Sequence, residues 1–256
     1  MIASTSQILT PDDIAVANAV ASLKASIDAT LTNHLVNNAP LPRGYLAPFV
    51  PPYQKRAAID PKGFIEAVLP YSSAHYSSSA PYELVNPFCV ISGTYDNYPN
   101  LAPRSAMRLF SELNADSMAG IGDVAYYARI TGTSLYVALE GKNRVSLYRH
   151  YRRLIGARVH EVPFPADRNV AIENLRLHQV RPFGHVALSR PLHLSAFRDY
   201  SWAHKQRAYA ILPFPDAIVP LLMRCGIPFG DSVWKLSSWR HYDEGVIAAT
   251  RHLMMN

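Results

Sequence analysis

The residues of this chain that could do chemistry gather around one glycine. Gly141 is flanked by Glu140 and Lys142, and Arg144 follows three residues later. A glycine allows a sharp turn after a strand, and the first N–H groups of a following helix attract anions. With Lys142 and Arg144 close by, the spacing favours a turn that binds phosphate. The same pattern is typical of an ordinary β-α-β unit whose basic residues are solvated.

Such a turn needs a strand before it and a helix after it, and the pattern of apolar residues predicts both. Residues 135–139 are a short β-rich run, and residues 124–130 form a second run that Thr131-Gly-Thr133 joins to it as a hairpin. After the turn, an apolar stripe at helical spacing predicts a helix that ends at Gly156. Residues 157–164 then return as a strand.

Three arginines fall on one face of this predicted helix, near its C-terminal end: Arg149, Arg152 and Arg153. The helix dipole favours cations there, so a structural role is the default interpretation. The alternative is contact with DNA phosphates. A helix pair at residues 216–234 could act as a helix-turn-helix, but Pro220 lies within its first helix and Ser232 stands where an apolar residue is needed.

The segments before and after this central unit are predicted to form different kinds of secondary structure. Thr10 and Pro11 open a predicted long N-terminal helix that runs to about residue 37, and its apolar stripe would serve the core or a homodimer contact. Eleven of the twenty prolines lie between residues 40 and 103, which predicts short elements. These are a helix after Asp60-Pro61, a strand at 84–91 and a helix from 103 that ends near Asn114. Asp167 caps a further predicted helix through residues 171–178, and the C-terminal region is expected to be mainly helical.

Composition restricts the class of protein. The 256 residues are 49% hydrophobic with a net charge of +6, which suits a globular protein and is compatible with an acidic partner. Cys89 and Cys225 cannot form a disulfide framework, and no Cys/His spacing fits zinc, so a reducing compartment is expected. The sequence shows neither a signal peptide nor an apolar run of membrane length. We therefore expect a cytoplasmic protein without a membrane partner.

Three segments together resemble the ParB/sulfiredoxin superfamily. Glu140-Gly-Lys-Asn-Arg144 and then Ala171-Ile-Glu-Asn-Leu-Arg176 resemble its Gly-x-x-Arg turn and its Glu-Asn-Ile-Gln-Arg motif. Pro52-Tyr-Gln-Lys-Arg56 is similar to its early Pro-x-Gln-x-Arg box. The good match covers residues 124–179. The resemblance implies an α/β (α+β) fold with a ParB/sulfiredoxin-like domain at 41–180 that carries an insertion at about 71–114, between an N-terminal helical segment (1–40) and a helical C-terminal region (181–256).

The resemblance also implies a site for a nucleoside triphosphate with Mg²⁺. Glu140 and Glu173 would be its catalytic and metal-binding carboxylates. The implied phosphate-binding residues are Gly141, Lys142, Asn143, Arg144, Asn174, Arg176, Gln54 and Arg56. This chain departs from the family's pattern in having Lys142 where ParB proteins often have Glu, and Leu177 in place of the motif's Arg. The turn has no cysteine, so sulfinic-acid repair is not expected.

The implied function is regulation of a plasmid or other mobile genetic element, in its maintenance or in control of conjugative transfer, with NTPase or nuclease activity as an option. One alternative is an inactive scaffold that binds a protein of the conjugation or partition machinery, for example as a fertility inhibitor. The other is a DNA-binding partition-type protein. Because one fold hosts many activities, the resemblance does not choose among these.

Overall fold

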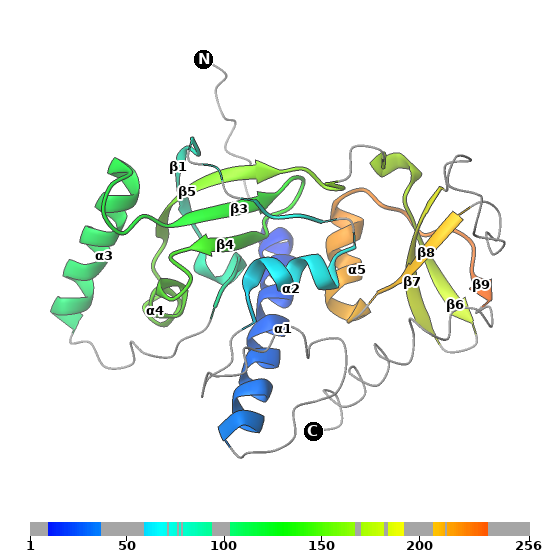
Figure 1. Cartoon of the computed structure of the whole chain (residues 1–256), viewed down its shortest axis with the longest axis horizontal. Coiled ribbons are helices and arrows are strands. Elements are labelled where there is room, and N and C mark those ends of the chain that lie inside the picture. The colour runs from blue at the N-terminus through cyan, green and yellow to red at the C-terminus, as the bar shows by residue number, and fades with distance from the viewer. Residues whose placement is uncertain are drawn as a thin grey trace.

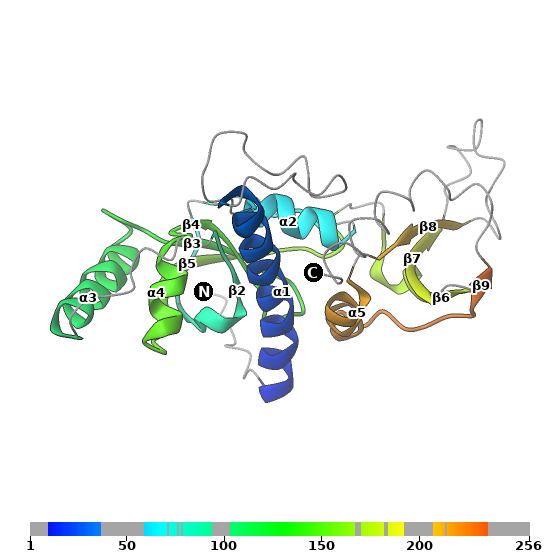
Figure 2. The ribbon, with the colours of Figure 1, turned by 90° about the horizontal axis from the view of Figure 1, so that it is seen from below.

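The structure is a computed structural model that describes residues 10–36, 59–70, 72–75, 77, 79–93, 103–166, 170–181, 184–191, 207–212 and 214–234. Two β-sheets lie apart, and helices α1 (Pro11–Val36) and α5 (Pro215–Arg224) lie between them and contact each other (Figures 1 and 2). The mixed helix and strand content confirms the expected α+β class.

The first sheet, sheet A, holds the predicted hairpin at its centre. Its strand order is β1-β5-β3-β4-β2. Strands β3 and β4 are antiparallel, whereas β5 runs parallel to β3 and β2 runs parallel to β4. The strand bounds are β1 (Tyr82–Val85), β2 (Val90–Ile91), β3 (Tyr126–Ile130), β4 (Tyr136–Glu140) and β5 (Ile155–Val162).

The predicted strand at 84–91 is in fact two strands at opposite edges of sheet A. Only Asn86 and the 3₁₀ turn η2 (Pro87–Cys89) join β1 to β2. Five extended residue steps span at most about 18 Å, and the 3₁₀ turn shortens this link because it rises only about 2 Å per residue. Five flat strands need about 19 Å from edge to edge, so the sheet must coil. Segment 71–114 was expected to be an insertion. It supplies both edge strands and the start of α3 (Pro103–Ala119), so it is part of the core of this fold.

Two helices begin as the sequence predicts. At α1, the Asp13 N–H donates to Thr10 Oγ1 (3.2 Å) and the Thr10 N–H donates to Asp13 Oδ2 (3.2 Å), and the Thr10 hydroxyl bond holds the pKa of Asp13 below its ordinary value. At α2 (Pro61–Val68), Asp60 caps the helix by accepting the Gly63 N–H at 3.1 Å. Helix α2 contacts β4, and α3 contacts β5. These caps satisfy backbone donors that would otherwise lack partners.

Helix α3 continues beyond Asn114, where it was expected to end. The Asn114 side chain instead joins distant elements, because its Oδ1 accepts both the Tyr148 hydroxyl and the Gly156 N–H at 2.8 Å. An asparagine is tolerated inside a helix when its amide is used in tertiary bonds of this kind. Met107 and Phe110 of the predicted helical stripe lie on α3, where Phe110 is buried and Met107 is exposed.

The helix after the turn, α4 (Arg144–His150), is shorter than predicted, and Gly156 lies in β5. Arg152, with φ +51°, ends it in the left-handed region. The Arg152 N–H bonds to the Arg149 carbonyl (3.1 Å) and the Arg153 N–H bonds to the Tyr148 carbonyl (3.0 Å). These two bonds form a Schellman motif with arginine at the position that glycine usually occupies.

Replacing Arg152 with glycine is expected to stabilise the protein by about 1 kcal/mol, because it removes the left-handed strain of a residue with a Cβ. The change would appear as a higher urea midpoint with an unchanged slope. Arg153→Gly is the matched control. It should lower the midpoint, since Arg153 does not have a positive φ and glycine there adds conformational entropy to the unfolded chain and removes the exposed contact with the Met107 sulfur. Equal effects of the two variants would contradict the assignment.

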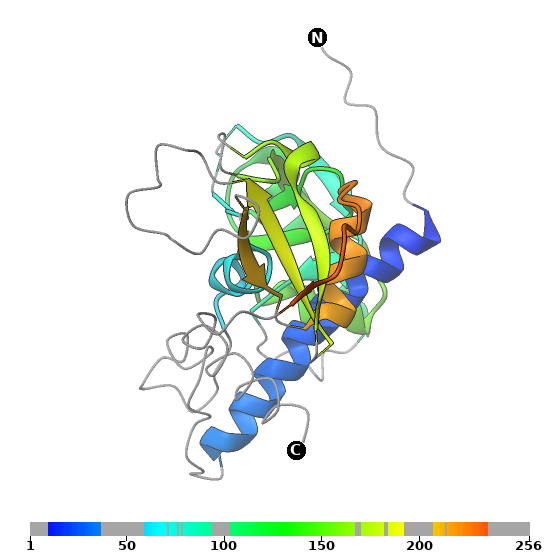
Figure 3. The same ribbon diagram turned by 90° about the vertical axis from the view of Figure 1, so that its right-hand side faces the viewer.

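The second sheet, sheet B, overturns the expectation of a mainly helical C-terminal region within the described residues (Figure 3). Its strand order is β8 (Arg207–Ile211), β7 (His185–Pro191), β6 (Arg176–Arg181) and β9 (Val233–Trp234). The predicted helix at 171–178 is the short turn η3 (Ile172–Asn174) followed by β6. His178 makes tertiary bonds that outweigh helical propensity, from Nε2 to Ser189 Oγ (2.8 Å) and from Nδ1 to the Asp231 carbonyl (2.7 Å).

The strands of sheet B include the predicted domain boundary and part of the predicted helix pair. Residue 180, the expected boundary, falls inside β6, so the division between the sheets lies earlier, after β5. Helix α5 confirms the first helix of the pair. In place of the second, residues 233–234 form β9, and residues 235–256 lie outside the described part of the chain, as does Asp167. Among the described helices, none has a stretch that is both long enough and apolar enough to cross a bilayer.

Candidate functional site

The Gly141 turn lies at a cleft, as predicted. Gly141 has φ +70°, and a Cβ there would lie 3.0 Å from the Ala125 Cβ and 3.0 Å from the Arg144 Nε. Both observations require glycine at this position. The cleft has a volume of about 410 Å³ and is lined by residues 140–144 together with Leu109, Leu113 and Asp123. Its size suits a small molecule.

Arg144 lines the cleft, but its guanidinium is already engaged. The side chain is 3% exposed, and Nη2 lies 2.7 Å from Asp123 Oδ1. It also donates to the Asp123 carbonyl (2.6 Å), Ser117 Oγ (3.3 Å) and the Leu113 carbonyl (3.4 Å). A guanidinium has five donors in a fixed fork, and these contacts use it to join α4 to the end of α3 and the entry to β3. The geometry thus favours a structural role for Arg144.

Lys142 and Asn143 lie at the rim of the cleft. The Lys142 Nζ is 2.6 Å from Asp60 Oδ1, so the turn is tied to the cap of α2. Burial alone would raise the pKa of Asp60, but the hydrogen bonds from Lys142 and Gly63 outweigh it and hold that pKa below its ordinary value. Asn143 is exposed, and its side chain makes no capping bond to α4. A ligand in the cleft can therefore reach the Asn143 amide and the Lys142 ammonium, which it would share with Asp60.

The structure does not bring the second predicted motif to this cleft. Glu140 pairs with Tyr126 at the start of β3, whereas β5 ends at Val162, opposite Ile130 at the far end of β3. The chain then leads to η3, which carries Glu173 and Asn174 and lies beyond the end of β5, on the other side of the view from α4 (Figure 1). Arg176 donates to the Glu173 and Leu175 carbonyls. The order of the two motifs along the sequence does not show that the fold places them far apart in space.

The predicted Mg²⁺ ligands do not fit one metal ion in this arrangement. Glu140 is exposed and accepts the Gly141 N–H at 3.0 Å, and Glu173 lies away from it on η3. Within the described residues, no three or more His, Cys, Asp or Glu side chains form a group that could hold a metal. Gln54 and Arg56 of the early box lie outside the described residues.

Comparison of the chain with models of protein families, with curated proteins and with solved structures gives no match. The resemblance to the ParB/sulfiredoxin superfamily therefore stays a prediction that depends on three sequence segments, at residues 52–56, 140–144 and 171–176.

Arg149 of α4 and the arginines that follow the helix, Arg152 and Arg153, do not form one free basic face. Arg149 donates to the Pro87 carbonyl (2.9 Å) and the Val90 carbonyl (2.6 Å), and burial lowers its pKa. Arg152 is the left-handed residue of the helix end, and Arg153 lies 3.5 Å from the Met107 sulfur. The Arg149 guanidinium is engaged by these carbonyls. Of the three arginines, only Arg152 and Arg153 are therefore exposed for contact with DNA phosphates.

Sequence reasoning missed the charged residues that support the cleft. Lys24 and Asp28 form a buried ion pair on α1, and Asp28 Oδ1 also accepts the Ile59 N–H (2.9 Å), next to Asp60. Burial lowers the pKa of Lys24, and Asp28 opposes that shift. The spacing of four residues within an apolar stripe was a usable signal. Asp123 carried no comparable signal, since only the fold brings it to Arg144.

Proposed function

We propose that this chain is a cytoplasmic regulatory protein of ParB/sulfiredoxin type that binds a nucleotide in the Gly141 cleft without hydrolysing it. The observation that supports the proposal is the cleft itself, built from a turn that only glycine can form, with Lys142 and Asn143 at its rim. The resemblance adds the expected setting, which is control of the maintenance or conjugative transfer of a mobile genetic element.

Binding is favoured over metal-assisted turnover because Glu140 and Glu173 do not converge. Within the turn, the Lys142 ammonium can contact phosphate oxygens, and the Asn143 amide can donate to them. Arg144 would act indirectly, by holding α4 and the turn in place through Asp123 and Ser117.

A specific observation favours a second candidate, a scaffold that acts by binding another protein. Asp123 neutralises Arg144, and Asp60 is paired with Lys142, so the cleft has less positive charge than a triphosphate site usually offers. A ParB-like protein that had lost the ability to bind nucleotide would keep this fold and would bind its protein partner through its surface.

The Asp60–Lys142 pair allows a sharp test of nucleotide binding. Asp60→Asn keeps a good helix cap but removes the carboxylate that pairs with Lys142. We expect it to tighten nucleotide binding about two- to fivefold, because that factor corresponds to the free energy of an exposed ion pair. Lys142→Met keeps the aliphatic stem and should weaken binding about tenfold by removing a charge-assisted bond. Calorimetry with CTP, ATP and GTP, with and without Mg²⁺, measures both effects.

The control is Arg108→Met, which removes an exposed cation on α3 and should leave nucleotide affinity unchanged. Binding without phosphate release supports a regulatory binding protein, and release of phosphate would overturn the absence of hydrolysis. If no nucleotide binds in the millimolar range to either the wild type or Asp60→Asn, the scaffold becomes the better candidate.

A further inference from the structure

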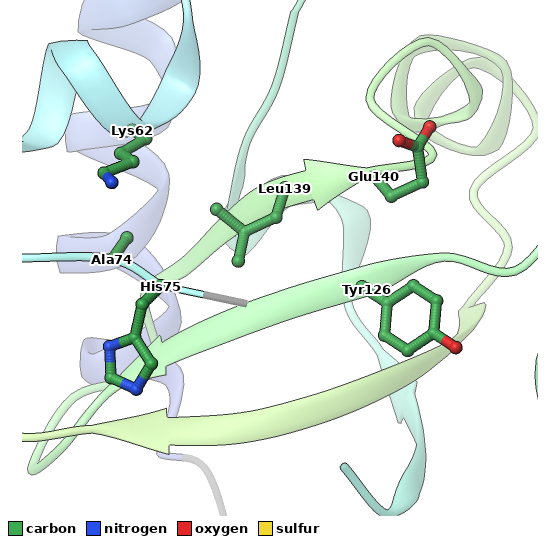
Figure 4. Close-up of a pocket in the computed structure, with 6 residues that line it drawn as sticks. All are labelled: Lys62, Ala74, His75, Tyr126, Leu139 and Glu140. Atoms are coloured by element: carbon green, nitrogen blue, oxygen red, sulfur yellow. The ribbon is translucent and has the colours of Figure 1, made fainter. Parts of the chain in front are cut away.

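A second pocket of about 410 Å³ shares Glu140 with the Gly141 cleft (Figure 4). It is lined by Lys62 of α2, Ala74 and His75 of the segment before β1, Tyr126 of β3, and Leu139 and Glu140 of β4. Lys62 and His75 lie at one end, Glu140 lies at the other, and Leu139 is between them (Figure 4). The pocket therefore has opposite charges at its ends and an apolar middle.

The charges at the two ends are available to a ligand. The Lys62 side chain is 48% exposed, and its nearest carboxylate, Glu66, is 3.9 Å away. Glu66 Oε1 also lies within bonding distance of Ser73 Oγ (3.3 Å) and the Ala74 N–H (3.4 Å), so it is shared among several donors. Glu140 is exposed and uses Oε1 for the Gly141 N–H, which leaves its other oxygen to accept from a ligand.

The walls between these charges are held by the fold. The His75 ring packs against the His160 ring of β5, with the ring centroids 5.2 Å apart and the planes tilted by 52°. Leu139 and Tyr126 lie on neighbouring strands of sheet A, where Tyr126 is paired with Glu140. The volume of this pocket falls in the range of small-molecule sites, and polar groups at its two ends could orient a ligand.

We propose that this pocket binds a small zwitterion of amino-acid to dipeptide size, with its anionic group at Lys62 and His75 and its cationic group at Glu140. An anion alone would place no cation at Glu140, and a cation alone would place no anion at Lys62, whose pair with Glu66 is long at 3.9 Å. A molecule with opposite charges at its two ends satisfies both, while its middle lies against Leu139 and Ala74. The proposal does not rest on nucleotide binding at the Gly141 cleft, although both pockets are lined by Glu140.

A series of linear ω-amino acids tests the arrangement directly. Calorimetry with β-alanine, γ-aminobutyrate, ε-aminocaproate and ω-aminocaprylate should show an optimum length, because Lys62 and Glu140 lie at opposite ends of the pocket. Caproate and hexylamine each carry only one of the two charges, and each should bind at least tenfold more weakly than the amino acid of the same length. Lys62→Met and Glu140→Gln should each weaken the best probe about tenfold.

Three further variants distinguish specific binding in this pocket from a general effect of surface charge. Arg108→Met and Glu112→Gln remove an exposed ion pair on α3 and should leave probe binding unchanged. The double reversal Lys62→Glu/Glu140→Lys should restore binding, since a linear zwitterion can enter in the opposite direction. The proposal is overturned if no ω-amino acid binds in the millimolar range, if caproate or hexylamine binds as tightly as ε-aminocaproate, or if Lys62→Met and Glu140→Gln bind as the wild type does.

Discussion

Replacing Asp28 with asparagine is expected to cost about 3–5 kcal/mol of stability, because it leaves the Lys24 ammonium buried without a counter-charge. Lys24 and Asp28 are 1% and 3% exposed in their side chains, and they form an ion pair within α1. Asparagine keeps an oxygen that can accept the Ile59 N–H, now 2.9 Å from Asp28 Oδ1, so the hydrogen bond to the α2 entry survives. The variant therefore removes the charge and leaves this hydrogen bond in place.

The double variant Lys24→Met/Asp28→Asn provides the decisive comparison. A buried ion pair often contributes little net stability, whereas one unpaired buried charge is costly. We therefore expect the double variant to recover most of the stability that Asp28→Asn loses, as measured by urea unfolding. If the double variant were as unstable as the single one, the cost would come from lost packing and the charge argument would be wrong.

Replacing Arg144 with methionine is expected to destabilise the protein by about 2–4 kcal/mol, because it leaves several acceptors without their donor. Arg144 bonds to Asp123, Ser117 and the Leu113 carbonyl, and it ties α4 to the end of α3. Lysine should rescue little, since an ammonium lacks the planar fork that reaches these groups together. Urea unfolding of both variants measures the effect.

Arg108→Met is the matched control for this prediction. Arg108 and Glu112 pair on the surface of α3, where both side chains are largely exposed, so the change should stay within about 0.5 kcal/mol. An Arg144→Met protein as stable as the wild type, but unable to bind nucleotide, would instead assign Arg144 to the ligand. That outcome would restore the role that the resemblance implies for this residue.

Local patterns in the sequence predicted the parts of the fold that depend on neighbouring residues. Thr10 and Asp13 cap α1, Asp60 caps α2, and the glycine-containing loop at Thr131-Gly-Thr133 joins β3 to β4 as a hairpin. The Gly141 turn and its cleft were predicted for the same reason, because a strand, a glycine and a helix follow one another within a few residues. Caps and tight turns act over three or four residues, so sequence spacing specifies them.

Tertiary structure decided what the functional side chains touch. Arg144 is bound to Asp123, 21 residues away along the chain, and Lys142 is bound to Asp60, 82 residues away. Asn114 continues α3 because its amide oxygen has partners on α4 and β5, and residues 176–181 form a strand because β7 and β9 pair with them. The separation of Glu173 from Gly141 follows from the direction in which β5 leaves the sheet. Such contacts join segments that are distant in sequence, and only the packed fold brings their atoms within bonding distance.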